Sequence, residues 1–128
     1  MDIKQVIQKW ITALRSGEYI QTNRRLKRDD CFCALGVLCD ILVKEGRGSW
    51  EYEVTSKVYQ YCNGEFKSAS FLPDDISSEM NRFFGHPVDS LASGLNDYGR
   101  DFNYIAEKIE RLLPKDIPSQ SNESLPQS

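Results

Sequence analysis

The sequence lacks both a long apolar segment and a strong net charge. No segment reaches the roughly 18–20 consecutive apolar residues that span a bilayer. Residues 1–6 contain an early acid and no uninterrupted apolar run, which is unlike a signal peptide. The net charge is −3, so no global field favours binding to nucleic acid. We therefore expect a cytoplasmic protein that has no membrane partner.

The sequence also lacks cysteines at the spacing of a metal site. Of its four cysteines, Cys31 and Cys33 are one residue closer together than paired zinc ligands usually are. Cys33 and Cys39 are six residues apart, which separates them by about 120° around a helix. Cys62 alone does not complete a ligand set. We expect thiols buried mainly as core side chains, with no metal and no cofactor.

The length and composition predict one globular domain. A chain of 128 residues, of which 40% are hydrophobic, has enough apolar surface for a single core. We expect this domain to cover residues 1–113. From Pro114 the composition shifts to Pro, Ser, Gln and Asn, so residues 114–128 are expected to be disordered or loosely docked.

The most apolar part of the chain is residues 31–43, which predicts a helix over 31–45 that is buried at the centre of the fold. Asp29 or Asp30 is the expected N-cap of this helix. Gly36 inside it costs about 1 kcal/mol relative to alanine. We therefore expect Gly36 to allow a neighbouring element to approach closely.

Apolar residues at helical spacing predict three further helices, over about 3–16, 73–84 and 102–113. Asp101 is expected to cap the last of them. Residues 90–95 fit no single pattern, and residues 96–99 are expected to form a turn, because Asn, Asp and Gly favour turns.

Between the central helix and residue 72, the pattern changes to one rich in aromatic and β-branched residues. Asn63–Gly64 predicts a hairpin over about 57–71. Residues 52–60 fit a strand or a short helix, because Val54 and Val58 are four residues apart. The predicted fold class is α+β, with about four helices packed round a buried central helix (31–45) and a small antiparallel hairpin or sheet near 50–71.

Three motifs run through the chain. They are WxxALRSGxYxQ over residues 10–21, FCxLGVLCD over 32–40 and LNDxGxxFxxIAxxIE over 95–110, with Leu72–Pro73 between the second and third. Together they resemble a family of short proteins that is widespread in phages and prophages. The resemblance implies a phage origin and a location in the cytoplasm of the infected or lysogenic bacterial host. It implies no activity for any particular residue.

The segment before the central helix is the most basic part of the chain, with four charges in Arg24, Arg25, Lys27 and Arg28. These side chains form either a solvated loop or a clamp for an anionic ligand, because a planar guanidinium pairs with phosphate oxygens in bidentate fashion. A buried helix start beside them would favour negative charge. The candidate ligand-binding residues are Arg15, Tyr19, Arg24, Arg25, Arg28, Asn96 and Asp97.

Some of these candidates have a second interpretation. Tyr19 offers a ring on which a base can stack, and Asn96 and Asp97 either bind a ligand or only hydrogen-bond the nearby backbone. Cys33 in the first turn of a helix near arginines suits a nucleophile, with His86, the only histidine, as its base. However, residues 32–35 are typical of a core, so we assign no catalytic residue.

Together, these observations favour a phage-type counter-defence protein that binds and sequesters a phosphate-containing, nucleotide-like host signal without catalysis. The alternative is a protein-binding inhibitor or adaptor that acts on a host machine, and a small cysteine hydrolase is the third class. The partners that these classes imply are an anionic nucleotide-like small molecule, a host protein or a second copy of the chain.

Overall fold

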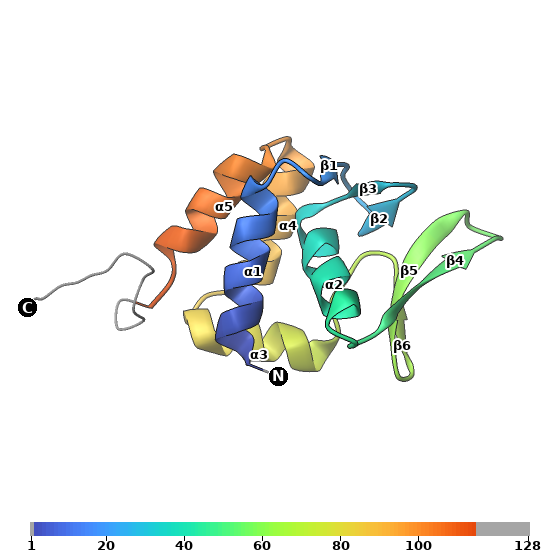
Figure 1. Ribbon diagram of the computed structural model, residues 1–128, viewed down its shortest axis with the longest axis horizontal. Helices are drawn as coiled ribbons and strands as arrows, with labels where there is room; N and C mark the ends of the chain where they lie inside the picture. The colour runs from blue at the N-terminus through green and yellow to red at the C-terminus, as the bar shows by residue number, and fades with distance from the viewer. Residues whose placement is uncertain (1, 115–128) are drawn as a thin grey trace, which may run out of the picture.

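Residues 2–114 are described by a computed structural model, in which five helices form the body and two small sheets lie beside it (Figure 1). This is the α+β class that the sequence predicts. The helices are α1 (Ile3–Arg15), α2 (Ala34–Lys44), α3 (Asp74–Phe84), α4 (Val88–Tyr98) and α5 (Phe102–Arg111). The strands are β1 (Ile20–Gln21), β2 (Lys27–Arg28), β3 (Cys31–Phe32), β4 (Ser49–Glu53), β5 (Val58–Asn63) and β6 (Phe66–Ser68). No helix within residues 2–114 is long and apolar enough to cross a membrane.

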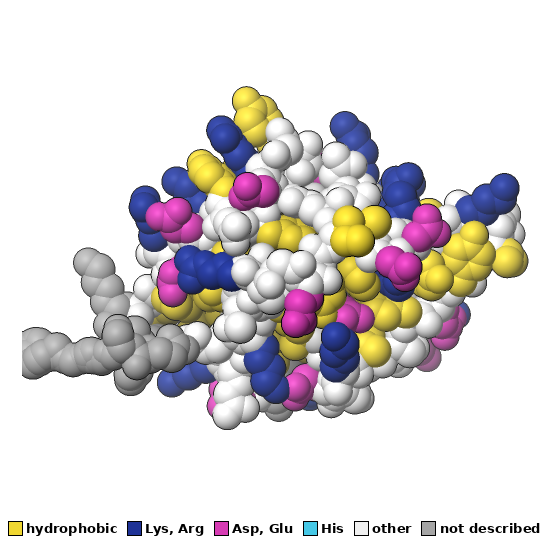
Figure 2. Space-filling model, turned by 45° about the horizontal axis from the view of Figure 1, so that its top comes forward, with side chains coloured by type: hydrophobic (Ala, Val, Ile, Leu, Met, Phe, Trp, Pro, Cys, Tyr) yellow, Lys and Arg dark blue, Asp and Glu magenta, His cyan; other side chains and the backbone are white. Residues whose placement is uncertain are grey.

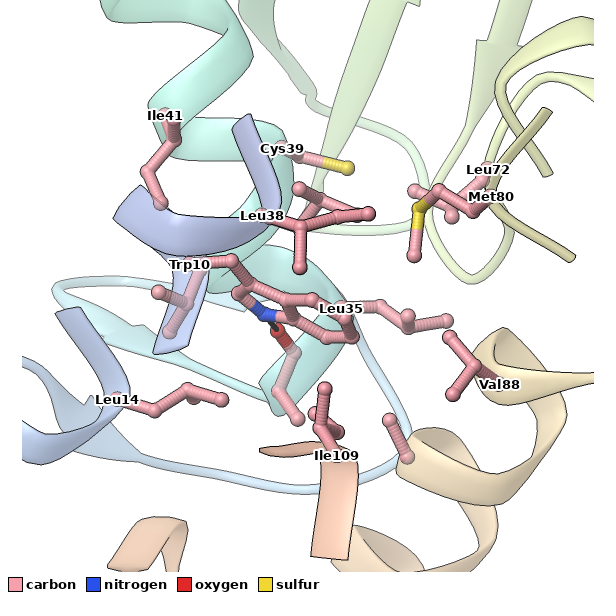
Figure 3. Close-up of a cluster of buried hydrophobic side chains, with 14 of the residues drawn as sticks. Trp10, Leu14, Leu35, Leu38, Cys39, Ile41, Leu72, Met80, Val88 and Ile109 are labelled. Atoms are coloured by element: carbon pink, nitrogen blue, oxygen red, sulfur yellow. Dashed lines mark hydrogen bonds between the residues drawn. The ribbon is translucent and has the colours of Figure 1, made fainter. Parts of the chain in front are cut away.

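The first helix, α1, agrees with its prediction to within one residue. Asp2 is its N-cap and accepts a hydrogen bond from the Lys4 backbone N–H at 3.1 Å. Its apolar stripe packs on α2 and α5. Trp10, at the centre of that stripe, is fully buried and donates its indole N–H to the Ala34 carbonyl at 2.9 Å (Figure 3). The tryptophan thus ties α1 to the start of the central helix.

The central helix α2 is buried as predicted, but the prediction that it starts at residue 31 is wrong. Cys31 and Phe32 form β3, which pairs in parallel with β1 and antiparallel with β2. The N-cap is Cys33, whose sulfur accepts the Gly36 N–H at 3.3 Å, and neither Asp29 nor Asp30 caps the helix. An apolar run does not distinguish a buried strand from a buried helix. The pairing residues of β1 and β2 decide the structure here.

Gly36 allows the close approach that the sequence predicts. A Cβ atom at this position would lie 1.7 Å from the backbone oxygen of Leu26. Leu26 is fully buried, its N–H donates to the Ala69 carbonyl at 2.8 Å, and its carbonyl accepts from the Cys33 N–H at 3.1 Å. The basic segment, residues 24–28, is therefore held against α2 through Leu26, its one apolar residue.

The second sheet contains the predicted hairpin. Strands β5 and β6 are antiparallel, with Asn63 opposite Phe66. Strand β4 extends this sheet, with Tyr52 opposite Tyr59. Residues 52–60 thus belong to two strands joined by a turn and not to a helix. The β4–β5 hairpin projects away from the helices (Figure 1).

The C-terminal helices differ from the sequence prediction mainly in α4, while α5 ends at Arg111, two residues before the predicted end. Residues 90–95, which fitted no single pattern, lie in α4, and residues 96–98 continue that helix instead of forming a turn. The buried residues Val88, Ala92 and Asn96 are four apart and place one face of α4 in the core. Gly99 ends the helix with a φ of 104°, and Asp101 caps α5 as predicted. The predicted tail, apart from Pro114, lies outside the described residues.

Candidate functional site

Two of the predicted arginines line one hollow, which we call the basic hollow. It lies where the loop after β1 meets the N-cap of α2, the segment after β6 and the last turns of α4, and its volume is about 260 Å³. The lining residues are Arg24, Arg25, Cys33, Ser70, Phe71, Ser93 and Asp97.

Asn96 holds this region of the chain together. It is 2% exposed, and its side-chain oxygen accepts the Ala34 backbone N–H and the Gln21 side-chain amide, both at 3.0 Å. Its amide nitrogen donates to the Thr22 carbonyl at 2.7 Å. One side chain thereby connects the end of α4, the first amide of α2 and the start of the loop that carries Arg24 and Arg25. Its hydrogen bonds favour a positioning role over direct contact with a ligand.

Asp97 fixes the backbone of Arg24. Its carboxylate accepts the Arg24 backbone N–H at 3.0 Å. Arg24 has a φ of 68°, a left-handed conformation that costs a non-glycine residue about 1–2 kcal/mol. Strained residues are concentrated at functional sites, where the surrounding structure holds them in place. The hydrogen bond from the Arg24 backbone to Asp97 holds Arg24 at the rim of the hollow.

The guanidinium groups at this rim are available to bind. Within residues 2–114, neither Arg24 nor Arg25 forms an ion pair, and Arg25 donates one hydrogen bond to the Arg24 carbonyl at 2.8 Å. The hydroxyl groups of Ser70 and Ser93 have no hydrogen-bond partner in this part of the chain. Basic and acidic side chains are interspersed on the face in Figure 2. The face in this view is therefore not uniformly basic.

Two backbone amides at the start of α2 already have partners. The Ala34 N–H donates to Asn96, and the Gly36 N–H donates to the sulfur of Cys33. These bonds use donors that a free helix start would present. An anion in the basic hollow would therefore be held by side chains rather than by the helix start that the sequence singled out.

The other predicted ligand residues lie outside the basic hollow. Arg15 forms an ion pair with Glu110 at 2.8 Å, between α1 and α5. Arg28 lies exposed in β2. Tyr19 donates its hydroxyl to Asp40 at 2.6 Å, and burial together with this hydrogen bond raises the pKa of Tyr19. The structure thus brings together Arg24, Arg25 and Asp97, next to Asn96, from the predicted set.

Asp40 is the centre of a polar cluster that the sequence did not predict. Besides Tyr19, it accepts the Trp50 indole N–H at 3.0 Å and pairs with Lys44 at 3.3 Å. Burial opposes ionisation, but the bonds from these three partners outweigh it and lower the pKa of Asp40. The cluster joins the segment before β1, α2 and β4, and each of its polar groups has a partner within the cluster. We assign it a structural role.

Cys33 does not have the features of a nucleophile. It is 7% exposed, and burial raises the pKa of its thiol, whereas a reactive cysteine needs a lowered pKa. Its sulfur serves as the N-cap of α2. His86, the predicted base, is exposed in the connection between α3 and α4.

Ser70, Phe71 and Ser93 are the lining residues that sequence analysis missed. Serine in a loop or helix carries no signal of its own, and Phe71 was assigned to the end of the hairpin. An aromatic residue beyond the last strand pair, next to Leu72–Pro73, was the one available hint.

Comparison with known proteins places the chain in a family. No curated protein and no solved structure matches it. One family model, described as a domain of unknown function, matches residues 2–113, which are nearly all of the residues described above. The chain therefore belongs to the DUF8296 family.

Proposed function

We propose that the protein binds a small anionic, nucleotide-like ligand in the basic hollow and sequesters it without catalysis. The observation that carries this proposal is the pair of guanidinium groups, Arg24 and Arg25, at the rim of a hollow and without ion pairs in residues 2–114. Arginine pairs with phosphate oxygens through two parallel hydrogen bonds. Binding of this kind requires no catalytic group.

The remaining lining supports a ligand with a ring. Phe71 is 71% exposed although it is a large apolar side chain, and it lines the hollow. A base can stack on this ring. In other nucleic-acid-binding sites, alanine substitution shows that such stacking contributes about 1–3 kcal/mol per base. The hydroxyl groups of Ser70 and Ser93 supply further hydrogen bonds to phosphate or sugar.

The biological part of the proposal rests on the phage resemblance of the sequence motifs. A phage protein that holds a nucleotide-like signal of its host prevents that signal from reaching its receptor. On this proposal, the protein is a counter-defence protein of the infected cell, and its ligand is the host signal.

A binding experiment with matched variants tests the ligand. Thermal shift and calorimetry with nucleoside monophosphates, cyclic nucleotides and ADP-ribose should identify a ligand for the wild type. Arg24→Ala or Arg25→Ala should then weaken binding by about 1.5–3 kcal/mol, and binding should weaken as salt rises. Arg82→Ala is the control, because Arg82 is exposed on α3 and does not line the hollow.

The outcomes separate the possibilities. If no member of the panel shifts the wild type, the sequestration proposal fails. If a ligand binds and only Arg28→Ala weakens it, the ligand lies at β2 and the basic hollow is not its site.

One observation favours the alternative of a protein-binding inhibitor. The projecting β4–β5 hairpin exposes Tyr52 and Val54, which are 50% and 72% exposed. If the protein acts through this surface, the double change Tyr52→Ser and Val54→Ser should abolish its effect on phage growth in the host. Arg24→Ala should then leave that effect intact. Sequestration predicts the opposite pattern.

A further inference from the structure

A second hollow continues the basic one along α4. We call it the acidic hollow, because Asp74 and Asp89 are among its lining residues, and its volume is about 410 Å³. Phe71 and Ser93 line both hollows. Ligand pockets commonly have volumes of about 300–1,000 Å³, a range that a groove made of both hollows reaches.

One face of α4 forms the floor of this groove. Ser90, Ser93 and Gly94 line the acidic hollow, and Ser93 and Asp97 line the basic one. Their spacing of three and four residues places them on the same side of the helix. At 1.5 Å per residue, the floor from Ser90 to Asp97 is about 10 Å long. Small side chains along most of this length leave room for a flat ligand.

The two ends of the groove have opposite charge. Arg24 and Arg25 lie at one end together with a single carboxylate, Asp97, whereas Asp74 and Asp89 lie at the other end, where no basic residue within residues 2–114 lines the hollow. Asp89 already accepts the Ser77 hydroxyl and, at 2.8 Å, the Ser90 backbone N–H. Asp74 is exposed in the first turn of α3, and its carboxylate has no hydrogen-bond or ion-pair partner within residues 2–114. Asp74 is therefore the acceptor that is available to a ligand.

We propose that the groove binds a nucleotide whose base carries an exocyclic amine, an inference that rests on the proposed function. The phosphate lies between Arg24 and Arg25, the base stacks on Phe71, and the amine donates a hydrogen bond to Asp74. An amine is a donor on adenine, guanine and cytosine, whereas the corresponding position of uracil is an acceptor. A ligand with negative charge at both ends would place one charge against the carboxylates.

Matched ligands test the amine. Inosine monophosphate lacks the amines of adenosine and guanosine monophosphate, and uridine monophosphate lacks that of cytidine monophosphate. For at least one of these pairs, wild type should bind the amine-bearing nucleotide about tenfold more tightly, the ratio expected from one hydrogen bond to a charged group. Equal affinity within every pair would overturn the inference.

Matched variants test the residues. Asp74→Asn should abolish that discrimination while pyrophosphate, which needs only the arginines, binds as it does to wild type. Phe71→Ala should weaken the nucleotide and not pyrophosphate. Asp75→Asn is the control, because Asp75 is an exposed neighbour in the same turn of α3 and does not line the groove.

The two proposals fail in different ways. If Arg24→Ala and Arg25→Ala weaken the nucleotide but Asp74→Asn leaves the discrimination unchanged, the basic hollow binds the ligand and the inference about the amine is wrong. If neither arginine variant changes binding of nucleotide or pyrophosphate, the proposed function fails and the inference fails with it.

Discussion

Asn96 offers the sharpest test of how the fold positions the candidate site. Replacing it with alanine removes the acceptor for the Ala34 N–H and for the Gln21 amide, and the donor to the Thr22 carbonyl. The Ala34 N–H is buried, and an unsatisfied buried donor costs about 1–3 kcal/mol. The Gln21 amide and the Thr22 carbonyl are partly exposed, so water replaces some of their loss. We expect a total loss of about 2–4 kcal/mol in the free energy of unfolding.

The assay is urea denaturation followed by circular dichroism. For a two-state domain, the midpoint should fall while the denaturant slope stays the same. Asn103→Ala is the matched control, because Asn103 is exposed on α5, and this change should leave stability within about 0.5 kcal/mol. A loss below about 1 kcal/mol for Asn96→Ala would refute the reasoning, since it would mean that the three hydrogen bonds contribute little.

Four further substitutions, which make three tests, address other parts of the fold. Gly36→Ala should destabilise by about 2–3 kcal/mol, because its Cβ meets the Leu26 backbone oxygen at 1.7 Å; an unchanged urea midpoint would contradict this close approach. Folding lowers the pKa of Asp40, so the ionised carboxylate stabilises the fold above its unfolded-state pKa, and this stabilisation is lost as pH falls through its folded-state pKa. Asp40→Asn should therefore flatten the acid limb of a curve of stability against pH. An unaltered acid limb would contradict this. Cys39→Ser should lower the free energy of unfolding by about 1–3 kcal/mol, because Cys39 is fully buried. Cys33→Ser should lower it less, because serine is a good N-cap. Equal losses of stability in thermal denaturation would count against the capping role of Cys33.

The elements that the sequence predicted well are those decided by local periodicity. The stripe of α1, the Asn63–Gly64 hairpin and the Asp101 cap each depend on residues within one turn or one strand pair. The predicted start of α2 was wrong because residues 31–32 form a strand between β2, a few residues upstream, and β1, which lies 11 residues upstream. The apolar run itself does not reveal either pairing. Residues 96–98 were expected to form a turn because Asn and Asp favour turns, but the core contact of Asn96 keeps them in α4.

The sequence predicted which residues of the candidate site are charged, but it did not predict which of them lie together. The basic run identified Arg24 and Arg25, since a cluster of arginines is visible in the sequence itself. Which of the five candidate cations and rings meet at one hollow depends on the path of the loop across α2. That path is fixed by Gly36, Leu26 and Asn96. The sequence indicated the close approach at Gly36, but it indicated Asn96 only as a ligand or turn residue and gave no sign of Leu26 as an anchor.

The strain at Arg24 links the fold to the proposed site. A left-handed arginine costs about 1–2 kcal/mol, and a glycine at the same position would remove that cost. If Arg24 served only solubility, Arg24→Gly would stabilise the protein without any functional loss. If the loop is shaped to present the guanidinium to a phosphate, Arg24→Gly should raise the unfolding midpoint slightly and yet weaken nucleotide binding as much as Arg24→Ala does. Stability and binding would then change in opposite directions at one residue, which is the relation expected where backbone strain positions a binding group.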